Sequence, residues 1–89
     1  MNGLGRILLV EDDELLGSGI VDTLSRVGYA VEWLRDGTLA LPALTRSEFE
    51  GVILDLGLPG MDGLEVLRRA RAGGNKTPVL VLSARDAPG

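Results

Sequence analysis

Apolar and polar positions follow two different rhythms along the chain. In several short runs nearly every residue is apolar, which is typical of strands covered on both faces of a sheet. Between these runs, apolar residues recur every three or four positions, as in helices with one buried face. Four strands are therefore expected, at Arg6–Val10, Ala30–Leu34, Gly51–Leu54 and Val79–Leu82.

The first and third helices are predicted from their caps as well as from their periodicity. The first begins at Asp13 and ends at Gly28, which suits a left-handed cap. The third begins at Asp62, with Glu65 three residues later as in a capping box, and ends near residues 72–74. The apolar face of the first helix is formed by Leu16, Ile20, Leu24 and Val27.

The second helix is predicted to be irregular. Asp36 caps it, and Leu39, Leu41 and Leu44 recur at helical spacing. Pro42 has no amide hydrogen to donate and its ring crowds the preceding turn. We expect a kink there, or a helix that restarts with Pro42 in its first turn.

Strands that alternate with helices predict an α/β fold with a parallel sheet. Glu32 lies in the middle of the second strand and predicts an edge strand, whereas the first, third and fourth strands have interior compositions. The fourth strand, Val79–Leu82, has no charged residue of the kind that protects an edge, although it lies close to residue 89. We therefore expect that a fifth strand and its flanking helices are missing. The alternative, compatible with the first, is an edge covered by a second copy through dimerisation or exchange of elements.

Composition excludes several classes of function. The net charge of −4 is unlike that of a nucleic-acid-binding surface, and no apolar run is long enough to span a membrane. The chain has no cysteine, which excludes disulfides and fits a cytoplasmic location. It also has no histidine, so it offers no imidazole base, histidine metal ligand or phosphohistidine.

Candidate chemistry gathers at the carboxyl ends of the predicted strands, where ligands bind in parallel sheets. Glu11, Asp12 and Asp13 follow the first strand, Asp55 follows the third, and Ser83 follows the fourth. Carboxylates from neighbouring strand ends can converge on Mg²⁺, which prefers oxygen ligands and usually takes one or two protein carboxylates. A hydroxyl at Ser83 could donate to a phosphoryl oxygen.

Plainer roles are open for several of these charged residues. Asp13 and Asp62 suit helix caps, and acids near Asp13 favour the positive end of a helix dipole. Asp55 could begin a turn into Gly57, but an aspartate directly after an apolar strand needs a partner to offset its desolvation. A solvated helix face, or a docking surface for a partner, accounts for Arg68, Arg69 and Arg71.

Three segments carry a family resemblance. They are Ile-Leu-Leu-Val-Glu-Asp-Asp (7–13), Val-Ile-Leu-Asp-Leu-Gly-Leu-Pro-Gly-Met-Asp-Gly (52–63) and Pro-Val-Leu-Val-Leu-Ser-Ala-Arg-Asp (78–86). Together they resemble the receiver domains of bacterial two-component response regulators of the OmpR/PhoB type. The resemblance implies a flavodoxin-like parallel sheet of order 2-1-3-4, with residues 1–89 forming the N-terminal (βα)3β portion of one receiver domain.

The resemblance also implies roles for individual residues. Asp55 matches the phosphoacceptor, Asp12 a direct metal ligand, and Glu11 a ligand acting through water. Gly57 matches the position whose backbone carbonyl completes the metal site, and Ser83 the switch hydroxyl. The implied cofactor is Mg²⁺ and the implied phosphoryl donor a sensor histidine kinase. The implied parent protein is a DNA-binding transcription regulator, the fragment itself being a regulatory domain that binds neither nucleic acid nor membrane.

Two features depart from the family pattern. Gly57 offers no side chain at a position that often tunes the lifetime of the phosphoryl group, and the family's lysine after the fifth strand has no counterpart. Two other functions stay open. A metal-dependent phosphohydrolase would use the same aspartate nucleophile, although such enzymes commonly have a second aspartate where Gly57 stands. The other is a receiver-like interaction module that is never phosphorylated.

Overall fold

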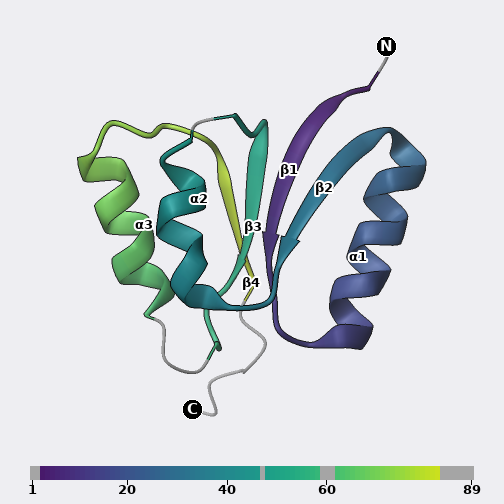
Figure 1. Cartoon of the computed structure of the whole chain (residues 1–89), viewed down its shortest axis with the longest axis horizontal. Helices are drawn as coiled ribbons and strands as arrows, with labels where there is room; N and C mark the ends of the chain where they lie inside the picture. The colour runs from purple at the N-terminus through teal and green to yellow at the C-terminus, as the bar shows by residue number, and fades with distance from the viewer. Residues whose placement is uncertain (1–2, 47, 59–61, 83–89) are drawn as a thin grey trace.

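The computed structural model describes residues 3–46, 48–58 and 62–82, which form one parallel sheet with helices on both faces (Figure 1). The sheet order is β2-β1-β3-β4, as predicted, and each neighbouring pair is parallel. The strands are β1 (Gly5–Val10), β2 (Tyr29–Leu34), β3 (Gly51–Asp55) and β4 (Val79–Leu82).

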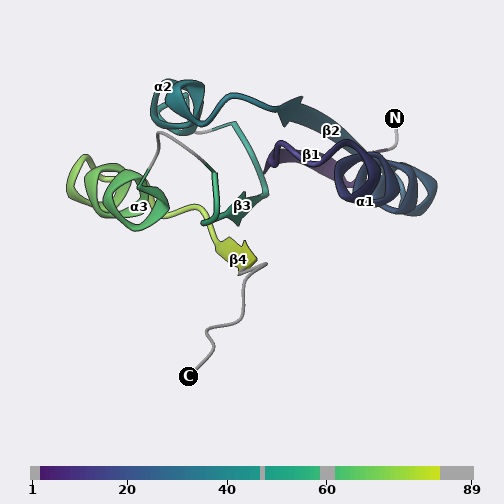
Figure 2. The same ribbon diagram turned by 90° about the horizontal axis from the view of Figure 1, so that it is seen from below.

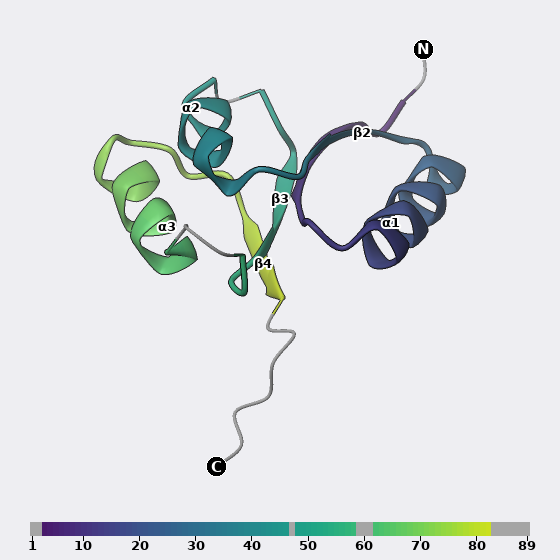
Figure 3. The ribbon, with the colours of Figure 1, turned by 60° about the horizontal axis from the view of Figure 1, so that its bottom comes forward.

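The helices alternate with the strands along the chain and divide between the two faces of the sheet. They are α1 (Glu14–Val27), a 3-10 turn η1 (Gly37–Leu39), α2 (Ala40–Leu44) and α3 (Gly63–Ala72). Figures 2 and 3 show α2 and α3 together on one face and α1 on the other. Among the described residues, no helix combines the length and apolarity needed to cross a bilayer.

Capping residues set the ends of α1 as predicted. The Asp13 carboxylate accepts the Leu16 amide at 2.8 Å, which satisfies one of the donors left free at a helix start. Gly28 ends the helix with φ 123°, a conformation that favours glycine, and its amide donates to the carbonyl of Leu24. The face predicted to be apolar forms, but Leu16 and Val27 on it stay exposed.

The predicted interruption of the second helix is confirmed. Asp36 accepts the Thr38 amide at 2.9 Å and caps η1 rather than a regular α-helix. The α-helical geometry starts at Ala40, so Pro42 lies in the first turn of α2. Backbone amides in a first turn have no carbonyl to bind within the helix, so a proline there costs no hydrogen bond.

One face of the sheet supplies most of the hydrophobic core. Leu8, Val10, Val52 and Leu54 are at most 2% exposed and belong to a cluster that includes residues of α2 and Ala70 of α3. Burying a leucine or valine side chain stabilises the fold by about 1.5–3 kcal/mol. This packing fixes the positions of β1 and β3. Glu11 and Asp12 directly follow β1, and Asp55 is the last residue of β3.

The two edges of the described sheet differ. The prediction that β2 is an edge strand is confirmed. By composition β4 resembles an interior strand, but it is the other edge, and Leu80 and Val81 on it are exposed.

Candidate metal centre

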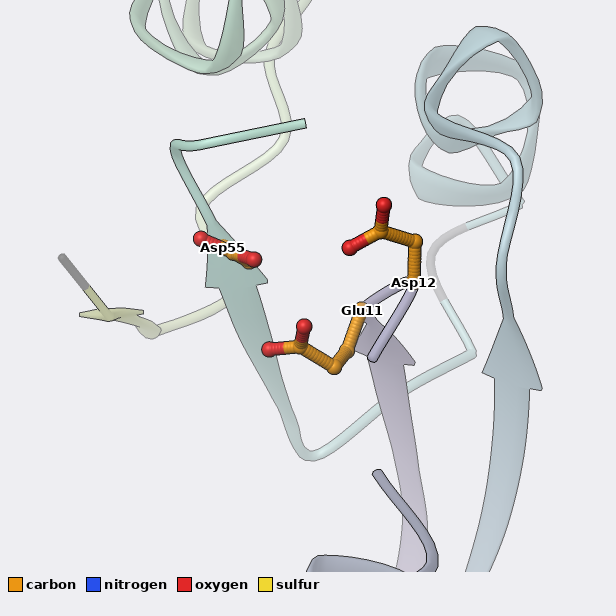
Figure 4. A group of neighbouring side chains, drawn as sticks. All are labelled: Glu11, Asp12 and Asp55. Carbon is orange, nitrogen blue, oxygen red and sulfur yellow. The ribbon is translucent and has the colours of Figure 1, made fainter. Parts of the chain in front are cut away.

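Three carboxylates meet at the carboxyl ends of β1 and β3. Val10 pairs with Leu54 in the ladder, so the next residues, Glu11 and Asp55, reach the same level of the sheet. Ligand oxygens of Glu11, Asp12 and Asp55 all lie within 4.8 Å of one another. In Figure 4, Asp55 extends from β3, while Glu11 and Asp12 extend from the turn after β1.

The three acids differ in their exposure to solvent. Glu11 is 1% exposed and Asp55 is 4% exposed, whereas Asp12 is exposed. The Glu11 Oε1 atom is buried and has no hydrogen-bond partner within the described part of the chain. A buried polar atom without a partner is uncommon in folded proteins and is expected to bind something further.

The other oxygen of Glu11 is tied to the adjoining turn. Its Oε2 atom accepts the amide of Asp13 at 3.0 Å. Burial raises the pKa of the Glu11 carboxyl above its ordinary value, and the Asp13 amide lowers it. The neighbouring carboxyl groups of Asp55 and Asp12 raise the pKa further. Within the part of the chain that the structure describes, no arginine or lysine forms an ion pair with any of these three carboxylates.

Asp55 is oriented by the turn that follows β3. Its Oδ1 atom accepts the amide of Gly57 at 2.8 Å. Leu58, which is 5% exposed, anchors this turn in the hydrophobic core, and the amide of Leu56 donates to the carbonyl of Leu82 at 3.1 Å. Asp55 thus begins a turn, as its sequence context allows, and also faces the two acids after β1.

The structure brings together Glu11, Asp12 and Asp55, which the sequence predicted as neighbours. Gly57 lies next to Asp55 in the same turn. Asp13 is a helix cap and is not part of the cluster. Ser83, the predicted switch hydroxyl, lies outside the described residues.

The charged residues of α3 and its cap bind groups in the helix or in the segment just after it. Asp62 accepts the amides of Leu64 and Glu65 and is the helix cap that its position predicted. The Glu65 carboxylate binds Arg68 and Arg69, and these hydrogen bonds lower its pKa to about 2. The capping box predicted from Glu65 is thus replaced by ion pairs further along the helix. Arg71 donates to the carbonyls of Asn75 and Thr77.

Two residues that support the acidic turn were not predicted from the sequence. Trp33 donates from Nε1 to the carbonyl of Glu11 at 2.8 Å, and Arg35 donates to the carbonyl of Asp12 at 3.4 Å. An aromatic residue on an edge strand usually indicates packing alone. The signal that could have found them is their place at the end of β2, beside the turn that the acids occupy.

The residues present fit a hard divalent cation. The three carboxylates form a donor set made only of oxygens and carrying excess negative charge. Their ligand oxygens lie within 4.8 Å of one another, and one oxygen of Glu11 is buried without a partner among the described residues. Mg²⁺ takes oxygen ligands, keeps several waters and commonly uses one or two carboxylates. The exposure of Asp12 leaves one side of the cluster open to water.

Comparison with known proteins identifies a family model that matches nearly the whole chain. Residues 7–88 match the response regulator receiver domain. The transcriptional regulatory protein QseB of Haemophilus influenzae is 49% identical over 81 residues, covering 91% of this chain and 37% of QseB. The response regulator protein PmrA of Pseudomonas aeruginosa is 53% identical over 81 residues, again 91% of this chain and 37% of the relative. The chain thus spans a little over a third of the length of these relatives.

Two solved structures of similar fold are receiver domains by name. The non-phosphorylated HemR receiver domain from Leptospira biflexa superposes with a TM-score of 0.83 at 34% identity, over 94% of this chain and 68% of that one. The BeF3-activated receiver domain of RstA from Klebsiella pneumoniae gives a TM-score of 0.81 at 32% identity, over 92% and 69%. These matches confirm the flavodoxin-like sheet predicted from the sequence.

Proposed function

Since the chain belongs to the receiver-domain family of two-component response regulators, we propose that it accepts a phosphoryl group on Asp55 with Mg²⁺ bound beside it. The observation that carries the proposal is the convergence of Glu11, Asp12 and Asp55 at one end of the sheet, with Glu11 Oε1 buried and unpaired. Family membership makes this a regulatory domain, and its relatives QseB and PmrA are regulators by name.

The acceptor role falls to Asp55 because of its position and its orientation. It ends β3 in the middle of the sheet, and the Gly57 amide fixes the rotation of its carboxylate. In the proposed reaction, an oxygen of Asp55 attacks the phosphorus of a phosphohistidine on a partner kinase. The new P–O bond replaces the P–N bond of the donor, and the imidazole leaves and takes up a proton.

The cation would be held by Asp12 and Asp55 directly, by the backbone carbonyl of Gly57, and by Glu11 through water. Bound there, Mg²⁺ supplies positive charge that offsets the repulsion between an anionic acceptor and an anionic phosphoryl donor. The chain's own contribution is to bury the Glu11 and Asp55 side chains at this end of the sheet, where charge interactions are stronger than in water.

The output of phosphorylation is proposed to pass through Ser83. A new phosphoryl group after β3 would recruit a hydroxyl from the end of β4, the neighbouring strand. By the same family argument, a sensor histidine kinase is the proposed donor and a DNA-binding transcription regulator the proposed parent protein.

Intact mass spectrometry tests the acceptor assignment. The chain is incubated with a small phosphoramidate donor, with Mg²⁺ or with EDTA, and one phosphoryl group should be added only with Mg²⁺. Asp55→Asn should abolish the adduct, whereas Asp62→Asn, at a helix cap away from the cluster, should leave it unchanged. An adduct that survives Asp55→Asn would refute the assignment. Steady release of phosphate from a phosphomonoester would instead indicate a phosphohydrolase.

A further inference from the structure

Side chains at the end of β2 form hydrogen bonds to the backbone of the turn that contains Glu11 and Asp12, two acids of the metal centre. The β1–β2 ladder reaches its last residue pair at Val10 and Leu34. Beyond it, the next two carbonyls of the turn accept side-chain donors from β2 and from the residue that follows it. Trp33 Nε1 of β2 donates to the carbonyl of Glu11 at 2.8 Å, and Arg35 Nη2 donates to that of Asp12 at 3.4 Å. Side chains thus continue the pairing of the two strands after the backbone ladder has ended.

The amides of the same turn are also bound. The Glu11 amide donates to the carbonyl of Leu34 at 3.0 Å, and the Asp13 amide donates to Glu11 Oε2 at 3.0 Å. The peptide groups on both sides of Glu11 are therefore fixed in orientation. Because a side chain leaves the backbone in a direction set by these peptide planes, the same bonds set where the Glu11 carboxylate points.

Trp33 is itself held firmly in place. A Cβ atom built on Gly17 of α1 would lie 2.1 Å from Trp33 Cζ2, so the indole contacts the helix at a position that leaves no room for a side chain. On Trp33 the guanidinium of Arg35 stacks at 5.3 Å from the ring centroid, and Arg35 also pairs with Glu14 at 3.3 Å. A large aromatic ring confined in this way is a rigid donor.

We propose that Trp33 is a positioning residue for the metal centre. Its indole N–H holds the Glu11 carbonyl and thereby directs the carboxylates of Glu11 and Asp12 toward Asp55. This inference rests on the proposed function, because it requires that these carboxylates bind Mg²⁺. Loss of a hydrogen bond that orients a metal ligand weakens metal binding even where the ligand itself is intact.

The test compares Mg²⁺ affinity in three chains, followed through the amide NMR signals of residues 11–13. Trp33→Phe keeps an aromatic ring against Gly17 and removes the donor. Its Mg²⁺ dissociation constant should rise about 3- to 10-fold, the effect of losing one hydrogen bond. Val31→Ala is the matched control, because Val31 lies on the same face of β2 and has no bond to the turn. It should lower stability and leave Mg²⁺ affinity unchanged.

A third chain separates the hydrogen bond from the shape of the ring. Chemical synthesis can place benzothienylalanine at position 33, where sulfur replaces the indole N–H in a ring of the same form. This chain should reproduce the weaker Mg²⁺ binding of Trp33→Phe. If it binds Mg²⁺ as tightly as the wild type, the indole acts by packing alone and the inference is wrong.

A metal-free signal tests the same bond. Trp33 is the only tryptophan, so its indole N–H gives a single NMR signal. That proton should exchange with solvent much more slowly than in free tryptophan, and exchange at the free rate would overturn the inference. Equal Mg²⁺ affinity in wild type and Trp33→Phe would overturn it while leaving the proposed function intact. Failure of the wild type to bind Mg²⁺ would overturn both.

Discussion

Replacing Glu11 by glutamine should stabilise the chain in the absence of metal. Glu11 is 1% exposed and its Oε1 atom lacks a partner within the described residues. An unpaired buried acceptor costs about 1–3 kcal/mol, and the charge of the carboxylate near Asp55 adds to that cost. Glutamine keeps the shape and one oxygen for the Asp13 amide, while its NH₂ group can donate to Asp55. We expect the variant to be more stable by about 1–2 kcal/mol, each kcal/mol raising the Tm by about 4–8 °C in a domain of this size.

Urea unfolding monitored by Trp33 fluorescence measures this effect, in EDTA and in Mg²⁺ at pH 7. In wild type, Mg²⁺ at about 100 times its dissociation constant should add about 2.7 kcal/mol to the free energy of unfolding. Glu11→Gln should gain clearly less. The control is Glu14→Gln, since the Glu14 side chain is 75% exposed and should change little in either condition. A Glu11→Gln chain less stable than wild type in EDTA would refute the reasoning.

The sign of the pH dependence follows from the same residue. Burial raises the pKa of Glu11 in the folded chain, so the folded state binds this proton more tightly than the unfolded state. The resulting stabilisation is fully present below the unfolded pKa and is lost as the pH rises through the folded pKa. In EDTA, the stability advantage of Glu11→Gln over wild type should therefore grow as the pH is raised through that window. An advantage that shrinks with rising pH would contradict the assignment.

Three further predictions concern the framework of the site. Leu54→Ala should cost about 2–5 kcal/mol because this side chain is fully buried beside Asp55, whereas Leu64→Ala, at 61% exposed, should cost about 0.5 kcal/mol or less in the same urea assay. Gly28→Ala should lower the Tm because φ is 123°, and Gly19→Ala, inside α1 with open space around it, should raise it; opposite signs would contradict the capping geometry. Carbon-13 NMR titration should give Glu65 a pKa of about 2, with its stabilising ion pairs present above pH 4.5 and lost as the pH falls toward 2; an ordinary pKa would show that the pairs do not form in solution.

Much of the fold could be predicted because its signals are local. Fully apolar runs identify interior strands, and an aspartate before a helix predicts a cap wherever its carboxylate can reach the first free amides, as Asp13 and Asp62 do. The convergence of Glu11 and Asp55 followed from one further rule, that parallel strands end at the same edge of the sheet.

The remaining features depend on contacts between residues far apart in the sequence. Nothing local distinguishes Glu11, which is buried, from Asp12, which is exposed. The support that Trp33 gives to the turn spans 22 positions and exists only once β2 lies beside β1. The composition of β4 indicates a strand with neighbours on both sides, yet β4 is an edge in the described sheet. Composition shows how apolar a strand is, and it does not show which strands lie beside it.

Mapping the modified residue tests the central claim most directly. After reaction with a phosphoramidate donor and Mg²⁺, borohydride reduces an aspartyl phosphate to homoserine, which tandem mass spectrometry then locates in the sequence. The account predicts homoserine at position 55 alone, and none when EDTA replaces Mg²⁺. Homoserine at Asp12, Asp13 or Asp62, or its complete absence under conditions in which the folded chain binds Mg²⁺, would contradict the account.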